Sequence, residues 1–143
     1  MNYFDTSALI KLLIQEAGSQ RAETLIIAEP SLATSKVAYA EVHAGLARKL
    51  REGALTPASH QTISDSFESD WRVYLRIELV DALLALTREL VMRHPLRGFD
   101  AIHLASALRL QQRTGEAVRF IASDERLLVA AQSEGLATVD VRS

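Results

Sequence analysis

The apolar and polar positions divide the chain into short apolar runs and longer helical stretches. Val42, Leu46 and Leu50 recur four residues apart within residues 35–52, and such a stripe predicts a helix. Short apolar runs bounded by turn residues are typical of buried strands. The pattern predicts strands at residues 2–5, 31–34, 75–80, 118–122 and 138–141, and helices at residues 8–14, 19–28, 35–52, 57–74, 81–93, 99–112 and 125–134.

Short strands therefore alternate with helices along the chain, and helix dominates. This order predicts the α/β class, with a short parallel sheet of four or five strands flanked by helices on both faces. Open sheets of this kind bind their ligands beyond the carboxyl ends of the strands. Functional residues are therefore expected at that edge.

Four acidic residues fall at positions that suit such a site. Asp5 ends the first strand and Asp124 follows the strand at 118–122, so both should project at the carboxyl edge. Asp100 opens a predicted helix. Glu41 lies within a helix whose same-face neighbours, three residues before and four after, are small and leave room beside its carboxylate.

Each acid alone has a structural explanation. Aspartate at a helix start commonly caps the helix and interacts with its dipole, and a glutamate within a helix is usually solvated. Thr6 and Ser7 are themselves expected to cap the first helix. Four converging carboxylates, however, cannot all stay ionised without a counter-charge. A divalent cation would supply that charge, bind a phosphodiester, activate water and stabilise the leaving oxygen.

Composition narrows the classes of protein. The chain has 143 residues, 48% hydrophobic and 24% charged, with a net charge of −2, so it is neither a disordered nor a globally basic protein. The absence of cysteine excludes disulfides, zinc ribbons and thiol catalysis and favours hard cations. Phosphate-loop, dinucleotide and nucleophile-elbow motifs are missing. We expect a cytoplasmic protein, because neither a signal-peptide pattern nor a membrane-length apolar run occurs.

Four blocks of sequence resemble those of PIN-domain proteins. The first two are Asp5-Thr6-Ser7-Ala8-Leu9 and Tyr39-Ala40-Glu41-Val42, and the others are Arg97-Gly98-Phe99-Asp100-Ala101-Ile102-His103-Leu104-Ala105-Ser106-Ala107 and Phe120-Ile121-Ala122-Ser123-Asp124-Glu125-Arg126-Leu127-Leu128. Their order and spacing match across essentially the whole chain, so residues 1–143 are expected to form one PIN-like domain. Within the family, the chain most resembles the VapC toxins of type II toxin–antitoxin systems.

This resemblance implies an Mg²⁺-dependent endoribonuclease, with Mn²⁺ able to substitute. It assigns the metal-holding acidic positions to Asp5, Glu41, Asp100 and Asp124, and it places Ser7 where the family often has a hydroxyl beside the metal water. It further implies an RNA substrate, a homodimer and a VapB-like antitoxin whose C-terminal segment covers the acidic groove, and no membrane partner.

One departure from the family lies near the last acid. Where the family often has threonine two residues before that aspartate, this chain has Ala122, followed by Ser123. Whether Asp124 would bind a metal directly or through water is left open, as is the number of metal ions. Two other functions also stay open: a non-catalytic PIN-fold module that binds an antitoxin or RNA, and a metal nuclease that cuts DNA.

Several other side chains could have a functional role, but we expect each of them to have a structural or solvent-exposed role instead. His103 follows Asp100 by one turn and is expected to be a helix-surface or hydrogen-bonded histidine, and Lys11 to be a solvated lysine. The basic residues 48–51 and the pair Arg93 and Arg97 could grip RNA, although such clusters are usually solvated. The aromatic residues Phe67, Trp71 and Tyr74 are expected in the core or a dimer interface rather than in a base-stacking platform.

Overall fold

The computed structural model describes all 143 residues, as five strands and seven helices. The strands are β1 (Asn2–Phe4), β2 (Leu32–Ser35), β3 (Leu75–Ile77), β4 (Arg119–Ala122) and β5 (Ala137–Asp140). The helices are α1 (Thr6–Leu13), α2 (Ser19–Ala28), α3 (Val37–Arg51), α4 (Pro57–Trp71), α5 (Asp81–Arg93), α6 (Gly98–Thr114) and α7 (Glu125–Ser133). The α/β class and the parallel five-stranded sheet predicted from the sequence are confirmed.

The largest differences from the predicted boundaries concern α4 and β3. The helix predicted at 57–74 ends at Trp71. The alternating run at 75–80 predicted a strand, but the strand ends at Ile77. Its only neighbour is β2, whose last residue, Ser35, pairs with Ile77. Residues 78–80 therefore have no strand to pair with.

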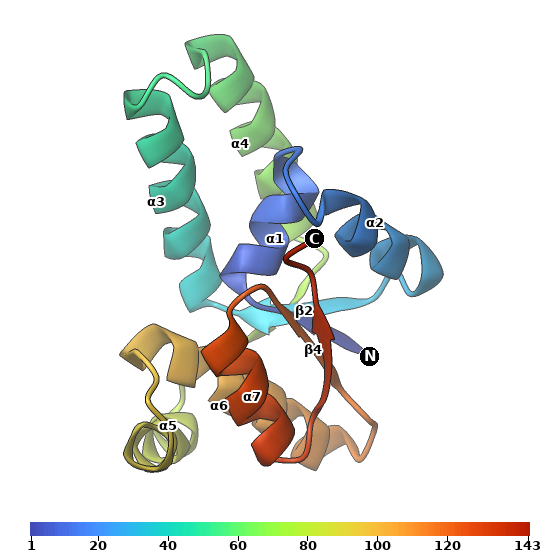
Figure 1. Ribbon diagram of the computed structural model, residues 1–143, viewed down its shortest axis with the longest axis vertical. Helices are drawn as coiled ribbons and strands as arrows, with labels where there is room; N and C mark the ends of the chain where they lie inside the picture. Colours follow the sequence, from blue (N-terminus) through green and yellow to red (C-terminus); the bar gives the residue numbers. More distant parts are fainter.

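The strand order of the sheet has one reversal point, which lies at its centre. All strands run parallel in the order β3-β2-β1-β4-β5. From β1 the chain builds outward to β2 and β3 on one side, and it later returns to build β4 and β5 on the other. The order reverses between β1 and β4, which is where parallel sheets open a crevice at their carboxyl edge. Figure 1 shows β2 and β4 at the middle of the molecule, with helices on both sides.

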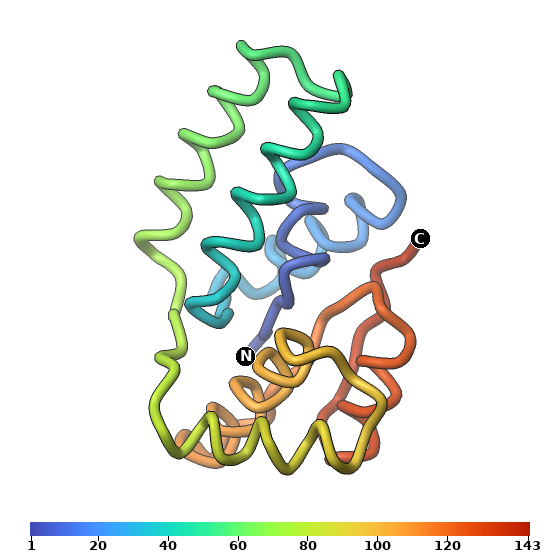
Figure 2. Tube along the Cα trace, turned by 90° about the vertical axis from the view of Figure 1, so that its left-hand side faces the viewer, coloured from blue at the N-terminus to red at the C-terminus, as the bar shows by residue number.

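The strands are buried on both faces, which explains their continuous apolar sequences. Tyr3 and Phe120 point into a core formed with α5, α6 and α7. Their neighbours Phe4 and Ile121 point to the opposite face, into a core formed with α1 to α4. Successive strand residues thus serve different cores, because side chains alternate across a sheet. Figure 2 shows the α3–α4 hairpin rising from one side and α5 to α7 gathered on the other.

The aromatic residues of α4 support the hairpin. Phe67 and Trp71 are buried in the core formed with α1 to α4, and Tyr74 packs against it. This confirms the core interpretation of these three residues. Tyr39 and His43 of α3 also reach across to the carboxylate of Glu68 on α4. None of the helices combines the length and apolar character needed to cross a membrane.

Two helices that follow strands, α1 and α7, are each capped by an aspartate close to the end of the preceding strand. Asp5 caps α1, accepting a hydrogen bond from the Ala8 amide at 2.9 Å, so the expectation that Thr6 and Ser7 cap this helix is wrong. Asp124 caps α7 in the same way through the Leu127 amide. An aspartate directly after a strand can satisfy a free amide of the following helix, which turns the chain sharply. The caps therefore hold both carboxylates at the sheet edge.

Candidate active site

The four predicted acids come from the central part of the fold. Asp5 follows β1 and Asp124 follows β4, on the two sides of the crevice where the strand order reverses. Asp100 lies in the first turn of α6, and Glu41 lies in the second turn of α3. Asp100 is electrostatically coupled to each of the other three. The tertiary structure thus brings to one region acids that are up to 119 residues apart in the sequence.

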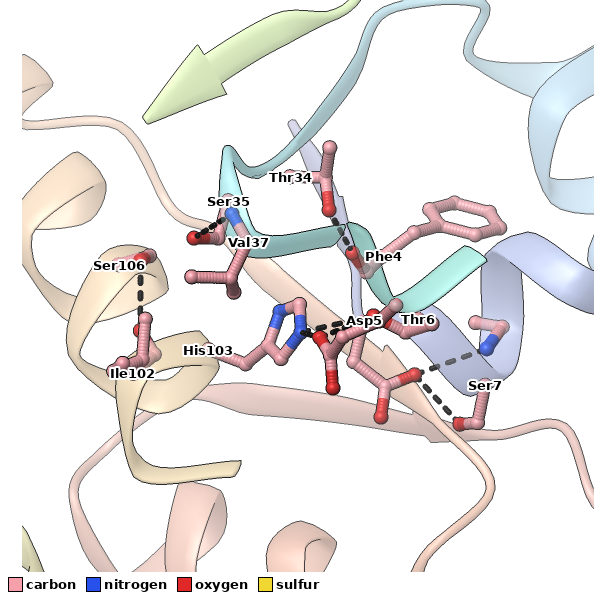
Figure 3. Close-up of polar contacts among 12 residues, drawn as sticks. Phe4, Asp5, Thr6, Ser7, Thr34, Ser35, Val37, Ile102, His103 and Ser106 are labelled. Carbon is pink, nitrogen blue, oxygen red and sulfur yellow. Dashed lines mark hydrogen bonds and ion pairs between the residues drawn. The ribbon is translucent and has the colours of Figure 1, made fainter. Parts of the chain in front are cut away.

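Asp5 is the most buried of these acids, with only 4% of its surface exposed. Its Oδ1 accepts hydrogen bonds from the Ser7 hydroxyl at 2.6 Å and from the Ala8 amide (Figure 3). The Ser7 hydroxyl oxygen in turn accepts from the Ser123 amide at 3.1 Å. Ser7 therefore fixes Asp5 and also ties the start of α1 to the loop after β4. Both hydrogen bonds leave Oδ2 of Asp5 available to a ligand.

Asp100 and Asp124 line a common pocket of about 330 Å³ at the starts of α6 and α7. Asp124 uses Oδ1 for its helix cap, and its other oxygen makes no hydrogen bond. The carboxylate of Asp100 makes no hydrogen bond at all, although the residue is partly buried. Anionic oxygens without donors are costly in a partly desolvated site. The pocket therefore favours a cation or a donor from a ligand.

Glu41 is held by two residues that the sequence did not mark as partners. Its Oε1 accepts from the Thr6 hydroxyl at 2.7 Å and lies 2.8 Å from Nε2 of His103. Burial alone would raise the pKa of Glu41, but the bonds from His103 and Thr6 outweigh it and lower the pKa. The structure therefore keeps this carboxylate ionised and oriented.

His103 links the acidic edge to the core. It is 1% exposed, so its interpretation as a hydrogen-bonded histidine is confirmed and a surface position is excluded. Nδ1 lies 2.8 Å from the hydroxyl of Tyr3, and burial raises the pKa of Tyr3 well above its usual value. Because a carboxylate can only accept, Nε2 carries the proton shared with Glu41, and in the neutral ring Nδ1 accepts from Tyr3. Figure 3 shows His103 pointing toward Thr6 beside Asp5.

The pKa values of Asp5 and Asp100 reflect the burial of these carboxylates and the proximity of other acids. Burial raises the pKa of Asp5, and the negative charge of Asp100 raises it further. The hydrogen bonds from Ser7 and Ala8 lower it, but the net pKa stays raised. Burial also raises the pKa of Asp100, and the charge of Asp124 adds to it. Both carboxylates would be stabilised by a nearby positive charge.

These acids fit a hard divalent cation by the chemistry of their donors. Mg²⁺ prefers carboxylate oxygens, and each of the four acids keeps at least one oxygen free of hydrogen bonds at the same sheet edge. As the side chains stand, however, no three His, Asp or Glu residues are grouped closely enough to hold a metal ion. The sequence identified the candidate residues, and the structure brings them to one edge of the sheet without grouping them into a metal-ligand cluster.

Of the basic residues considered in the sequence, Lys11 differs from its predicted surroundings and Arg93 does not. Lys11 is 8% exposed, and its Nζ donates to the Ala17 carbonyl at 2.6 Å and pairs with Glu16 at 3.1 Å. The expectation of a solvated lysine is therefore wrong, because the turn between α1 and α2 folds back over its side chain. Arg93 is exposed, as expected for a solvated residue, and it pairs with Glu134 at 2.9 Å, which ties the end of α5 to the end of α7. Arg97 is also exposed and makes no ion pair.

Sequence reasoning missed Thr6 and Tyr3 as members of the site. Thr6 carried a signal, because it directly follows Asp5, but helix capping explained it equally well. Tyr3 carried none, since a tyrosine in an apolar strand run looks like any core residue.

The fold and site together define an α/β protein that collects acidic residues at the carboxyl edge of a parallel sheet. The family model of the PIN domain matches residues 3–132. The chain therefore belongs to the PIN domain family. The resemblance noted in the four sequence blocks is confirmed.

Relatives and solved structures agree with this assignment. The chain is 39% identical over 106 residues to Ribonuclease VapC45 of Mycobacterium tuberculosis, which covers 74% of each chain. It superimposes with a TM-score of 0.68 on Mycobacterium tuberculosis VapC20, described as a Sarcin-Ricin loop cleaving toxin, at 17% identity over 97% of this chain and 98% of that one. Rickettsia felis VapBC2, solved with a DNA fragment from its promoter, gives a TM-score of 0.65 at 13% identity over 98% of each chain. At these identities the two solved structures support the fold.

Proposed function

We propose that this chain is a metal-dependent endoribonuclease and the toxin of a type II, VapBC-like toxin–antitoxin system. The observation that carries the proposal is the pocket shared by Asp100 and Asp124, where a carboxylate without any hydrogen bond donor faces another acid. The relative named Ribonuclease VapC45 supports RNA as the substrate.

In this proposal, Asp5, Glu41, Asp100 and Asp124 hold Mg²⁺, and Mn²⁺ can replace it. The bound ion would neutralise the carboxylates, activate a water and stabilise the leaving oxygen of a phosphodiester. Ser7 and the Ala8 amide fix the orientation of Asp5, whereas His103 and Thr6 both orient Glu41 and keep it ionised. Because water rather than the ribose 2′-hydroxyl attacks, the products should carry a 5′-phosphate and a 3′-hydroxyl.

The proposal extends to partners and location. An antitoxin partner is supported by a toxin–antitoxin complex among the proteins of similar fold, and in this proposal the antitoxin would cover the acidic groove. We also propose a cytoplasmic homodimer. Its support is a set of large apolar side chains left exposed on and just before α5: Leu79, Val80, Leu84, Val91 and Met92. Light scattering of the purified chain would test the dimer.

Cleavage of a labelled total-RNA pool tests the activity. Purified protein is compared with Asp100→Asn in Mg²⁺, in Mn²⁺ and in excess EDTA. Asp81→Asn is the matched control, because Asp81 also lies in the first turn of a helix but is exposed and outside the site. We expect discrete metal-dependent cuts from the wild type and the control, and none from Asp100→Asn. Cleavage by Asp100→Asn at the wild-type level would refute the site.

One observation favours a second candidate, a non-catalytic PIN-fold module that binds an antitoxin or RNA. No three ligand-type side chains are grouped closely enough for a metal as they stand. Calorimetric titration with Mn²⁺ separates the two functions. Binding that is lost in Asp100→Asn supports the nuclease, and no binding by the wild type supports the module. Parallel assays with single-stranded DNA decide whether a metal nuclease of this kind is confined to RNA.

A further inference from the structure

Two pockets meet at the consecutive residues Ser123 and Asp124. One pocket contains Asp124 together with Asp100, and its rim carries Arg97 and Arg126. The other contains Ser123 and Ser7, and its rim carries Arg48 and Lys49 from the last turns of α3. The acidic edge therefore lies between two basic pairs, which we name the 97/126 pair and the 48/49 pair.

The members of both pairs make no ion pair or hydrogen bond through their side chains, in contrast to five other cations of this protein. Lys11, Lys36, Arg93, Arg119 and Arg142 are all engaged by acidic side chains. Arg97 illustrates the difference, because its charge lowers the pKa of Asp100 while it forms no ion pair with that residue.

The other acids that line these pockets do not account for the pairs. Glu125 lies against Arg142 at 3.6 Å, and Glu16 is paired with Lys11. Glu52 remains in the second pocket, exposed at the end of α3. Apart from Asp100 and Asp124 at the acidic edge and the two glutamates already paired, the four exposed or half-exposed cations therefore face only one further carboxylate, that of Glu52. A free cation on a pocket rim is well placed to bind an anion that arrives from solution.

The arrangement fits a phosphodiester chain better than a protein segment. Guanidinium groups bind phosphate with two parallel hydrogen bonds, and lysine binds it as a point charge. A basic segment that covered the acids would be repelled by the cations on both sides. A nucleic acid strand instead offers regularly spaced anions that can contact both pairs while one phosphate lies over the acids.

We propose that the 97/126 pair and the 48/49 pair bind the backbone phosphates of an RNA strand on opposite sides of the bond at the acidic edge. The strand would cross the sheet edge from the starts of α6 and α7, over Ser123 and Asp124, to the end of α3. This inference rests on the proposed function of the acids and adds the path of the substrate.

Salt-dependent binding tests the path without cleavage. Fluorescence anisotropy of a fluorescein-labelled oligouridine is measured in EDTA over a range of KCl concentrations. The variants are Arg97→Ala/Arg126→Ala and Arg48→Ala/Lys49→Ala. The matched control is Arg88→Ala/Arg113→Ala, which removes two exposed arginines without ion pairs that lie outside both pockets. All six side chains are at least partly exposed, and thermal melts verify that each variant is folded.

The expected result is a change in the slope of log affinity against log salt concentration. Each phosphate contact with a single strand contributes about 0.7 to that slope, so each site variant should lose about 1.4, and the control should lose none. An unchanged slope in either site variant would overturn the assignment of that pair. An equal loss in the control would overturn the path as a whole.

Two further measurements distinguish the proposed RNA path from the proposed nuclease activity and from binding of an acidic protein segment. If the wild type fails to cut RNA in Mg²⁺ but the slopes fall as expected, the proposed nuclease fails and the path stands. If the wild type cuts and both site variants cut with unchanged KM, the nuclease stands and the path is overturned. A labelled oligoglutamate peptide that binds as tightly as oligouridine, and loses its binding in the same variants, would assign the pairs to an acidic protein segment instead.

Discussion

Nε2 of His103 lies 2.8 Å from Oε1 of Glu41, and this contact connects the acidic edge of the sheet to its buried centre. The same ring meets the Tyr3 hydroxyl at its other nitrogen, across 100 residues of sequence. Tyr3 stacks on Phe120 of the neighbouring strand. The orientation of Glu41 is therefore fixed by the packing of β1, β4 and α6 and does not depend on α3 alone.

Replacing His103 should cost stability as well as orientation. His103→Ala leaves the Tyr3 hydroxyl and the half-buried Glu41 without their partner, and an unpaired buried polar group costs about 1–3 kcal/mol. His103→Gln retains a donor toward Glu41 and should lose less. Urea unfolding measures both variants, with His60→Ala as a control because His60 makes no side-chain hydrogen bond. Equal stability of His103→Ala and the wild type would contradict the network.

Asp100→Asn should separate metal binding from folding. Burial and the charge of Asp124 raise the pKa of Asp100. At neutral pH the ionised carboxylate of Asp100 therefore destabilises the folded chain, and this effect exceeds the stabilisation that the helix dipole gives it. The metal-free variant should therefore melt at a higher temperature than the wild type. Mn²⁺ at one hundred times its Kd should raise the Tm of the wild type by about 5–10 °C and leave the variant unchanged. Thermal melts with and without Mn²⁺ check both statements.

The pH dependence of that difference has a definite sign. Because its pKa is raised on folding, Asp100 binds more protons in the folded chain than in the unfolded chain, and its contribution to stability falls as pH rises through the raised pKa. The metal-free Tm advantage of Asp100→Asn should thus be largest at pH 7 and should shrink toward zero as the pH falls through the ordinary carboxyl range. Melts of both proteins between neutral and acidic pH measure it. A difference that grows on acidification would show that the pKa of Asp100 is lowered instead.

Gly18 should be intolerant of any side chain. It has a φ of +90°, and a Cβ built there would lie 1.8 Å from the carbonyl oxygen of Val141. The left-handed backbone costs about 1–2 kcal/mol for alanine, and forced overpacking adds about 1–3 kcal/mol. Gly135→Ala is the matched control, since Gly135 has a φ of +92° but open space around it. Chemical denaturation should show Gly18→Ala to be the more destabilised of the two, and equal losses would place the whole effect in the backbone.

Much of the fold could be read from local pattern. The limits of α2 and α5 coincide with the predicted 19–28 and 81–93, because turn residues and a following proline mark their ends. The acids could be placed at the sheet edge for a similar reason. Asp5 and Asp124 each follow a short apolar run, and that position alone fixes the end of the strand from which they project.

Lys11 shows where local pattern stops being informative. Four residues after Ser7 on a helix, it looked like a solvated lysine, yet the turn at Ala17 and Gly18 encloses it. Nothing within one helical turn of Lys11 indicates that enclosure. Its burial follows from the chain reversal after α1 and from the return of the C-terminal strand to the same place.

The strand and helix periods, the class of fold and the acids at the strand ends could be predicted from the chain alone, because they depend on residues a few positions apart. That His103 holds Glu41, that Lys11 is buried and that unpaired cations lie on both sides of the acids became evident only in the folded molecule. Lys11 is enclosed by the turn that follows α1, but the contacts of His103 and the placement of the cations depend on the strand order β3-β2-β1-β4-β5, which brings together residues up to about one hundred positions apart. Contacts of that range arise from the burial of two apolar cores against one sheet, and local sequence does not encode which partners that burial will bring together.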